Sequence, residues 1–247
     1  MIDPFHLEAY NEVTVNYNRD IEIFPVLKNM FEEIYGTSPY NSPTDMGVNM
    51  AGHCISDDEV CKEASRQEII RRNRYVKEQC SLDEYNKQEL VMNQAKVNVE
   101  DRKCVAAANK KASEANCYAG AIELDDGTII TGKTSDFMGS CSAILINAIK
   151  YLADIDEDIH LISPSAFGPI QHLKTEYLGS INPRLHSDEV LIALSLSAVD
   201  NDNAKLALEQ LPKLKGTQAH ITSSIGPMDA KVFSNLGIEV TYDAKQQ

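Results

Sequence analysis

The segment from Tyr118 to Ala153 constrains the fold of this chain more than any other. Two short runs of β-forming residues, 119–124 and 128–131, flank Asp125-Asp126-Gly127, and an Asp-Gly pair in that position is a strong signal for a hairpin. A polar connector follows, and then an almost wholly apolar stretch from 139 to 153. A helix that is apolar on most of its sides belongs in a protein core. The segment therefore predicts an antiparallel hairpin packed against a central helix.

Strands and helices alternate in the rest of the carboxy-terminal part. We expect short strands at 160–162, 219–222 and 238–242, and helices at 165–178, 188–200, 203–211 and 227–235. Such alternation is typical of a sheet covered by helices on both faces. The fold class is therefore α/β, with a three-layer α/β/α domain expected over residues 116–247.

Residues 1–115 show helix and turn signals in place of alternating strands and helices, and we expect them to form a mainly helical region. The sequence Ser56-Asp57-Asp58-Glu59 is a capping box with extra acid, which predicts a helix over about 57–80. Gly36 to Gly52 is dense in turn-forming residues and predicts a long polar loop before that helix. Further helical segments are expected at 82–97 and 100–115.

Composition narrows the functional classes. The chain has 247 residues, a formal net charge of −14 and 43% hydrophobic residues. Because nucleic-acid phosphates are bound by basic surfaces, this charge argues against DNA or RNA as a partner. The longest apolar run is shorter than the roughly 20 residues that cross a bilayer, and no signal-peptide pattern opens the sequence. We expect a cytoplasmic protein with no membrane partner.

The hairpin and the helix after it resemble the opening of the cytidine-deaminase fold. Zinc enzymes of that fold carry a Cys or His ligand and a Glu at the start of this helix, and a P-C-x-x-C segment after the next strand. Here the helix opens with Cys141 but no such Glu, and Ser165 and Gly168 stand where the two cysteines belong. A catalytic zinc needs three protein ligands. We therefore expect a deaminase-like topology with no metal, and keep a zinc-dependent hydrolase as a distant alternative.

Several strings spread over the chain are together similar to one bacterial family. They include NYNRD at 16–20, SPTDMGVNMAG at 42–52, DGTIITGKTS at 126–135 and NPRLHSDEVLIALS at 182–195. On these strings the chain is identified as a member of the family known as domain of unknown function 1846. That family has no settled biochemical function, so the resemblance does not name a reaction.

The resemblance implies that the chain is the carboxy-terminal half of a longer protein. The amino-terminal half of such proteins carries a glycine-rich segment that resembles a phosphate-binding loop, and no such segment is present in this sequence. We therefore expect no cofactor in this chain itself, with a nucleotide bound through a missing amino-terminal half. The expected partners are that half or further copies of the chain. A truncated reading frame and a separate subunit both fit.

Two groups of polar side chains in the first region are candidates for binding a phosphorylated ligand. The long loop supplies Thr44, Asp45 and Asn49, which can orient a polar ligand or cap the backbone of the loop itself. On the helix at 57–80, Arg71 and Arg72 suit phosphate or carboxylate groups. Interleaved glutamates on that helix fit a solvated surface with paired charges equally well.

The second region supplies Lys133, Arg184 and His186 as further candidates. Lys133 lies in a G-K-T triplet that lacks the full spacing of a phosphate-binding loop. Arg184 and His186 precede a helix whose expected N-cap is Ser187, and His186 can be a titrating or a structural residue. No catalytic residue is assigned, because catalytic triads are recognised by geometry. The favoured function is a nucleotide- or phosphate-linked site, and the alternative is a non-catalytic assembly module.

We predict that the purified chain carries no stoichiometric zinc, because Cys141 has no matched ligands in the sequence. Elemental analysis after dialysis against a metal-free buffer measures this directly, and Cys141→Ser should leave the metal content unchanged. One zinc per chain, removable only with loss of folding, would contradict the prediction.

Overall fold

The computed structural model describes residues 17–38, 58–83, 85–86, 89 and 97–244. Clustering of contacts divides the chain into two compact units, and the chain passes from one to the other between Arg102 and Lys103. This boundary comes earlier in the sequence than residue 116, where we expected it. The reason is that the helix beginning at Lys103 packs on the strands that follow it.

The described part of the first unit is helical. Its elements are α2, Tyr17–Tyr35, α5, Asp58–Val76, and a 3₁₀ turn, Val99–Asp101. The Ser65 hydroxyl donates to the Asn98 carbonyl at 2.7 Å, which fixes the 3₁₀ turn to α5. The predicted long loop, with Thr44, Asp45 and Asn49, lies outside the described residues.

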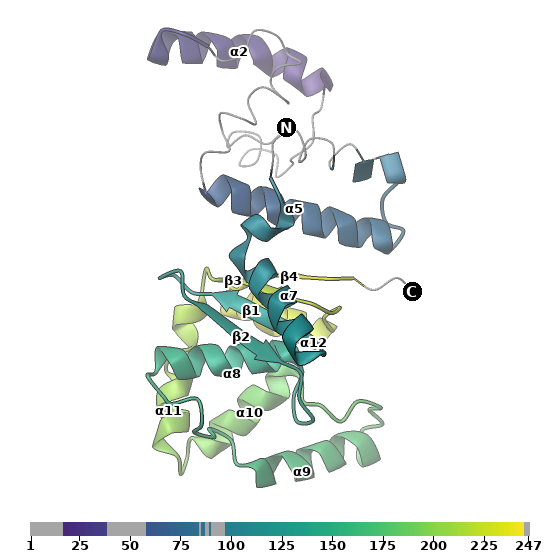
Figure 1. The fold of residues 1–247 in the computed structure, drawn as a ribbon, viewed down its shortest axis with the longest axis vertical. Coiled ribbons are helices and arrows are strands. Elements are labelled where there is room, and N and C mark those ends of the chain that lie inside the picture. The colour runs from purple at the N-terminus through teal and green to yellow at the C-terminus, as the bar shows by residue number, and fades with distance from the viewer. Residues whose placement is uncertain (1–16, 39–57, 84, 87–88, 90–96, 245–247) are drawn as a thin grey trace. The chain divides into compact units, whose positions relative to one another are not determined.

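The second unit is built on a mixed four-stranded sheet (Figure 1). Its strands are β1, Ala119–Glu123, β2, Ile129–Lys133, β3, Gln218–Ile221, and β4, Glu239–Tyr242. They lie in the order β2-β1-β3-β4, with β1 antiparallel to both neighbours and β3 parallel to β4. The hairpin turns where it was predicted, and Gly127 supplies the left-handed residue of the turn with φ +80°.

Helices cover both faces of this sheet (Figure 1). The helices that contact the strands are α7, Lys103–Ala115, α8, Ser140–Leu152, and α12, Pro227–Leu236. The other helices described in this unit are α9, Pro164–His172, α10, Ser187–Ser197, and α11, Asp202–Leu208, of which α10 and α11 pack on α8. Ala121 of β1 packs with Cys104 and Ala108 of α7. Its neighbour Ile122 faces the larger core, which includes Ile144 of α8 and Phe233 of α12. This alternation places α7 on one face and α8 with α12 on the other.

The strand expected at 160–162 is not formed. Leu161 and Ile162 are buried in the core, but the backbone there makes bends. Side chains hydrogen-bond to backbone carbonyls of this segment: Asn201 donates to Leu161 O, and Lys150 donates to Ile159 O. These carbonyls are therefore already occupied and do not pair with a neighbouring strand. The strand beside β1 is β3, so α9, α10 and α11 are inserted between α8 and that strand.

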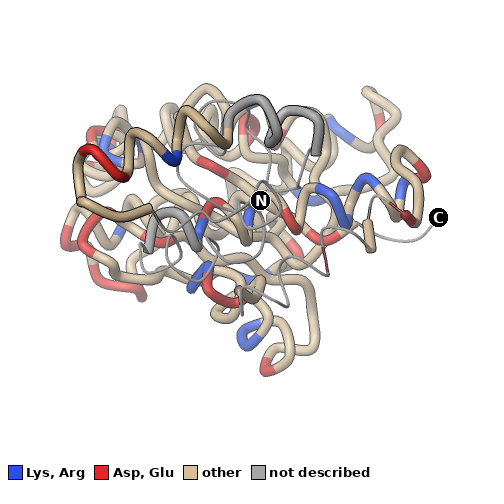
Figure 2. Tube along the Cα trace, turned by 90° about the horizontal axis from the view of Figure 1, so that it is seen from above, with Lys and Arg blue, Asp and Glu red and all other residues tan. Residues whose placement is uncertain are grey.

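Acidic and basic residues are interspersed along the described helices and loops (Figure 2). Among the helices in the described part of the chain, none is long and apolar enough to cross a bilayer.

We predict that Gly132→Ala destabilises the second unit by about 2 kcal/mol, because overpacking a tight contact typically costs 1–3 kcal/mol. A Cβ atom at Gly132 would lie 2.7 Å from backbone atoms of Ala143 and Ile144 on α8. Urea unfolding followed by circular dichroism measures the change. The control is Gly168→Ala in α9, where a Cβ atom meets nothing within 4 Å and helix propensity favours alanine. Equal stability of the two variants would contradict the close contact of β2 with α8.

Candidate functional site

The segments that precede α8 and α10 are joined by backbone hydrogen bonds. Met138 and Leu185 form a parallel β-bridge, and Leu185 N donates to Phe137 O at 2.9 Å. The Ser142 hydroxyl, in the first turn of α8, donates to Leu185 O at 3.2 Å. The N-termini of α8 and α10 therefore lie side by side.

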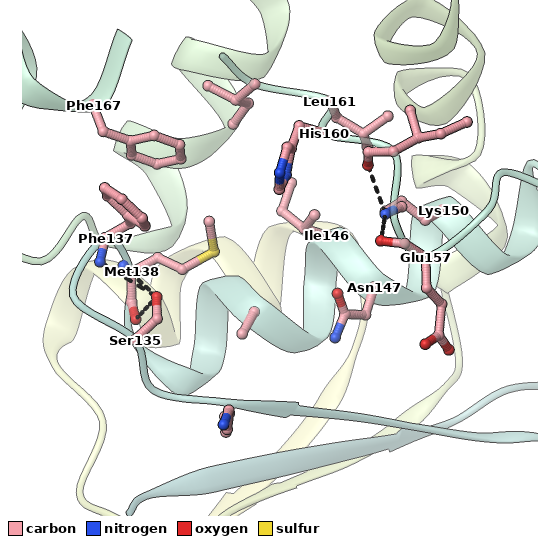
Figure 3. A pocket seen from close by; sticks show the side chains of 14 residues that line it. Ser135, Phe137, Met138, Ile146, Asn147, Lys150, Glu157, His160, Leu161 and Phe167 are labelled. Atoms are coloured by element: carbon pink, nitrogen blue, oxygen red, sulfur yellow. Dashed lines mark hydrogen bonds between the residues drawn. The ribbon is translucent and has the colours of Figure 1, made fainter. Parts of the chain in front are cut away.

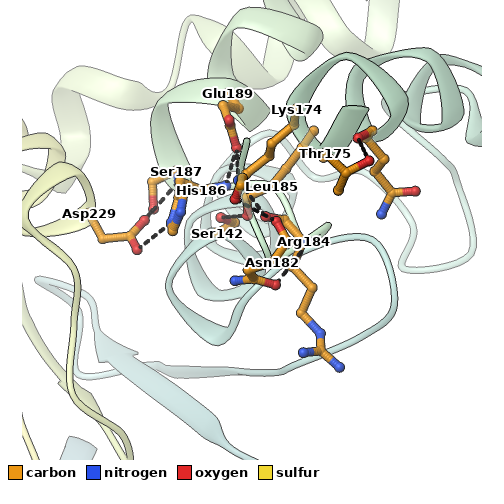
Figure 4. A network of polar contacts seen from close by, with 12 residues as sticks. Ser142, Lys174, Thr175, Asn182, Arg184, Leu185, His186, Ser187, Glu189 and Asp229 are labelled. Atoms are coloured by element: carbon orange, nitrogen blue, oxygen red, sulfur yellow. Dashed lines mark hydrogen bonds and ion pairs between the residues drawn. The ribbon is translucent and has the colours of Figure 1, made fainter. Parts of the chain in front are cut away.

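Asp229 joins the N-terminus of α12 to the N-terminus of α10. Its side chain lies in the first turn of α12 and is only 8% exposed. Oδ1 accepts hydrogen bonds from the Ser187 backbone N–H at 2.8 Å and from the Ser187 hydroxyl at 2.7 Å (Figure 4). Oδ2 lies 3.2 Å from His186 Nδ1. Because Ser187 begins α10, Asp229 satisfies one of the N–H groups that a helix start leaves without an intrahelical partner.

This arrangement changes the expected start of α10. The N-cap is His186, with extended backbone at φ −76° and ψ 169°, and not Ser187. The Ser187 hydroxyl donates to Asp229 and does not cap its own helix. The His186 N–H donates to Glu189 Oε2 at 2.7 Å, so the acid three residues later supplies the local cap.

A buried lysine fixes the turn before α10. Lys174 is 5% exposed, and its Nζ donates to Arg184 O at 2.7 Å and to Glu189 Oε2 at 2.6 Å. Removal of either partner of a buried ion pair is strongly destabilising, because the other charge stays buried and unpaired. The backbone at Arg184 is thus held on a rigid segment.

These helix starts border a pocket of about 330 Å³, which we call the polar pocket. Its lining includes Gly139 and Gly226, the N-caps of α8 and α12. The first turn of a helix carries partial positive charge and N–H groups that favour anions. The polar side chains that line it are Tyr118, Thr134, Ser140, Cys141, Asn182, Arg184, His186, Ser223, Ser224 and Asp229.

Among the described residues that line this pocket, Arg184 is the only one with a permanently charged basic side chain. Its Nε donates to Ser135 O at 2.7 Å, and its backbone N–H donates to Asn182 Oδ1 at 3.1 Å. Figure 4 shows the guanidinium group extending away from the polar network. The bond through Nε orients the fork, whose remaining N–H groups suit two oxygens of a phosphate or a carboxylate.

His186 lines the pocket with one ring nitrogen next to a carboxylate. Asp229 lies at Nδ1, and a carboxylate at that nitrogen favours the tautomer that carries its proton there. Nε2 is then the nitrogen that can accept a proton or a hydrogen bond from a ligand. The pair has the orientation of a general base with its supporting carboxylate.

Cys141 lines the same pocket as a protonated thiol. Burial raises the pKa of the thiol well above its ordinary value, and the negative charge of Asp229 adds to that rise. Metal ligation and nucleophilic attack both require the thiolate. Across the residues described by the structure, no group of three or more His, Cys, Asp or Glu side chains is placed to hold a metal ion.

The residues predicted from the sequence fall in separate places. Arg184 and His186 line the polar pocket. Lys133 is exposed at the end of β2 and borders a different pocket. Whether any of them binds a ligand stays a prediction.

Arg71 and Arg72 lie on α5 in the first unit, where Arg72 is exposed. Burial raises the pKa of the Glu68 carboxyl, the charge of Glu89 adds to that rise, and the charge of Arg72 opposes it. The ion pair between Arg66 and Glu63 fits the interpretation of α5 as a helix with paired charges, and a ligand role for Arg71 and Arg72 stays a prediction.

Sequence reasoning missed Asp229, although it organises the polar pocket. The signal was present in Gly226-Pro227-Met228-Asp229, since Gly-Pro opens a helix and the acid falls in its first turn. The sequence alone does not show that the start of α10 lies beside Asp229.

Comparison with protein-family models gives two matches that together span the chain. The C-terminal model of Domain of unknown function DUF1846 matches residues 100–247, and the N-terminal model matches residues 1–103. The chain belongs to the DUF1846 family. The match at residues 1–103 corrects our expectation that only the carboxy-terminal half of the family is represented here.

Curated relatives of this DUF1846 chain are bacterial proteins named UPF0371. The UPF0371 protein cu0538 of Corynebacterium urealyticum is 51% identical over 254 residues, which cover 99% of this chain and 50% of the relative. A UPF0371 protein of Streptococcus thermophilus is 54% identical over 252 residues, covering 100% and 51%. One from Streptococcus pneumoniae is 52% identical with the same coverage. The chain spans about half the length of these relatives, and their names state no activity.

We predict that Asp229→Asn destabilises the second unit by about 1–3 kcal/mol, the cost of leaving a buried donor without its acceptor. The amide accepts on one side only, so with its oxygen on Ser187 it must donate to His186 and force the imidazole into the other tautomer, or lose one of the two contacts. Urea unfolding measures the effect, with Asp200→Asn at an exposed site as the matched control. If both variants unfold at the same urea concentration, Asp229 does not hold the starts of α10 and α12 together.

Proposed function

We propose that this chain binds a phosphorylated small molecule, of the nucleotide or phosphate-ester class, in the polar pocket. The observation that carries the proposal is that Arg184 and the first turns of α8 and α12 line the same cavity. A guanidinium fork and helix N-termini are the groups that proteins use to bind phosphate. A volume of about 330 Å³ suits a small ligand.

His186 and Asp229 extend the proposal from binding to chemistry. With Asp229 at Nδ1, the imidazole is oriented to take a proton at Nε2 from water or from a ligand hydroxyl. Arg184 would neutralise phosphate charge in the same pocket. Together these groups fit acid–base chemistry next to a phosphate, such as hydrolysis or transfer.

The strand order supports a deaminase-like topology for the second unit. In zinc deaminases the site residues lie at the starts of two helices, one after the hairpin and one after the next strand. The counterparts here are α8 and α12, which both border the polar pocket. The segment Ser223–Asp229 then takes the place that we had assigned to Ser165 and Gly168. It carries hydroxyls and a carboxylate where the zinc enzymes carry cysteines.

The activity of the longer family members is also a proposal. Because the chain spans about half the length of its curated relatives, we propose that the remaining part of those proteins contributes the nucleotide-linked chemistry, in the cytoplasm and without nucleic acid or membrane as partner. The part played by Thr44, Asp45, Asn49, Arg71 and Arg72 belongs to this proposal.

An assembly module is the second candidate, favoured by one face of α10 and the residue beyond it. Ile192, Leu196 and Val199 are spaced along this face and are 61%, 68% and 78% exposed. Contiguous exposed apolar residues mark surfaces that bind proteins. A module of this kind would lose self-association or partner binding on Leu196→Glu while keeping its ligand binding.

We predict that Arg184→Ala weakens pyrophosphate binding by about tenfold or more, since a hydrogen bond to a charged group contributes about 1.5–3 kcal/mol. Isothermal titration of the purified chain measures the change, and Arg184→Lys should restore part of the affinity. Arg74→Ala, at an exposed arginine of α5, is the matched control, and Arg72→Ala tests the sequence prediction in the same titration. His186→Gln should leave pyrophosphate affinity within about twofold and abolish any hydrolysis.

Absence of saturable pyrophosphate or nucleotide binding to the wild-type chain would reject the phosphate proposal. Equal weakening by Arg184→Ala and Arg74→Ala would place the binding outside the polar pocket. Sedimentation equilibrium of the wild type and Leu196→Glu then tests the assembly module.

A further inference from the structure

A second pocket lies beside the connector between β2 and α8 and encloses about 290 Å³ (Figure 3). We call it the aromatic pocket. It shares no lining residue with the polar pocket. Lys133 and Ser135 line the aromatic pocket, whereas Thr134 lines the polar one, as the alternation of side chains along extended backbone requires. The two pockets are therefore separate sites on either side of one connector.

One wall of this pocket is made of flat and polarisable side chains. Phe137 and Phe167 have ring centroids 5.0 Å apart with 38° between the ring planes. Figure 3 shows them together with Met138 at one end of the cavity. Phe167 is buried, whereas Phe137 is 43% exposed, so the protein leaves part of Phe137 uncovered. Aromatic and thioether groups of this kind pack well against a planar ring.

The opposite wall carries polar groups. Asn147 of α8 donates through Nδ2 to Thr131 O at 2.8 Å, so its Oδ1 is left as an acceptor. His160 stands across the cavity from Met138 (Figure 3). A few placed polar groups in an otherwise apolar pocket fix the orientation of a ligand and select its chemistry.

Lys150 holds this wall in place. It is 8% exposed, and its Nζ donates to Glu157 O at 2.6 Å and to Ile159 O at 2.7 Å. These bonds fix the loop that leads directly into His160. The lysine charge is thus engaged with backbone carbonyls, and the pocket is formed before any ligand arrives.

We propose that the aromatic pocket binds a planar, uncharged heteroaromatic ring of nucleobase size. The ring stacks on Phe137 and turns an N–H group toward Asn147 Oδ1. An aliphatic ligand would leave the Asn147 acceptor unused. The ammonium group of Lys150 is already bonded to two backbone carbonyls, which leaves exposed Lys133 as the cation of this lining that an anion could meet.

The fluorescent base 2-aminopurine is a suitable probe, because the chain contains no tryptophan to obscure its emission. We expect saturable quenching at one site per chain. Phe137→Ala should weaken binding about fivefold or more, as loss of a base–aromatic stack does in other proteins. Tyr177→Ala is the matched control, since Tyr177 is an aromatic residue that is 75% exposed and lies outside the pocket. Circular dichroism checks that each variant is folded, and Phe137→Leu replaces Phe137→Ala if the alanine variant unfolds.

Two further experiments test the contact with Asn147 and show whether the bound ring belongs to a free base or to a nucleotide. Asn147→Leu should weaken 2-aminopurine without weakening naphthalene, a planar uncharged ring that has no N–H group and needs no acceptor. Competition by adenine alone supports a free base as the ligand, and competition by adenosine monophosphate as well supports a nucleotide. Inorganic pyrophosphate should not displace 2-aminopurine, so failure of the phosphate proposal leaves this result unaffected.

Absence of saturable quenching would overturn the proposal, and so would equal weakening by Phe137→Ala and Tyr177→Ala. Unchanged binding in both Phe137 variants would overturn it as well, because stacking on that ring is its central contact.

Discussion

The carboxylate of Asp229 holds the starts of two helices together in the second unit. Asp229 sits in the first turn of α12 and accepts two hydrogen bonds from Ser187, the first residue of α10. Its second oxygen meets His186. A buried carboxylate is costly unless its oxygens are satisfied, and here the backbone N–H and hydroxyl of Ser187 and the imidazole of His186 satisfy them. This arrangement fixes where α10 begins relative to α12, and with it the position of His186 in the polar pocket.

The charge of the chain and the charge of the polar pocket have opposite signs. A net charge of −14 repels anions at long range. Over distances longer than about 8 Å, salt at physiological strength screens such repulsion. Inside the pocket, Arg184 and the helix starts act within contact distance. An acidic protein can therefore present a local anion site, and the overall charge excludes extended polyanions more strongly than small ones.

The parts of the fold that depend on neighbouring residues were predictable from the sequence. The hairpin around Gly127, helix α8 and the start of α12 all follow from local turn and helix signals. The expected strand at 160–162 was wrong because an apolar run of that length fits a buried loop as well as a strand. Local pattern gave no means of choosing β3 as the partner of β1.

In the candidate site, too, residues close together in the sequence were predictable, and contacts between distant residues were not. Arg184 and His186 stood out as a polar group ahead of a helix, and they line the polar pocket. Asp229 was missed, because its partner Ser187 is 42 residues away in the sequence. The aromatic pocket was missed for a similar reason, since Phe137 and Phe167 come together only when α9 folds back beside the connector.

The insertion of three helices before β3 has a consequence for how the chain folds during synthesis. Ala119 at the start of β1 bonds to Thr222, 103 residues later. Contacts of such long range close slowly, because the intervening chain loses entropy before any pairing compensates for it. While the ribosome makes the intervening segment, one edge of the hairpin has no strand to pair with, and unpaired edges invite aggregation. The nascent protein is therefore most vulnerable after α8 has formed and before β3 has emerged.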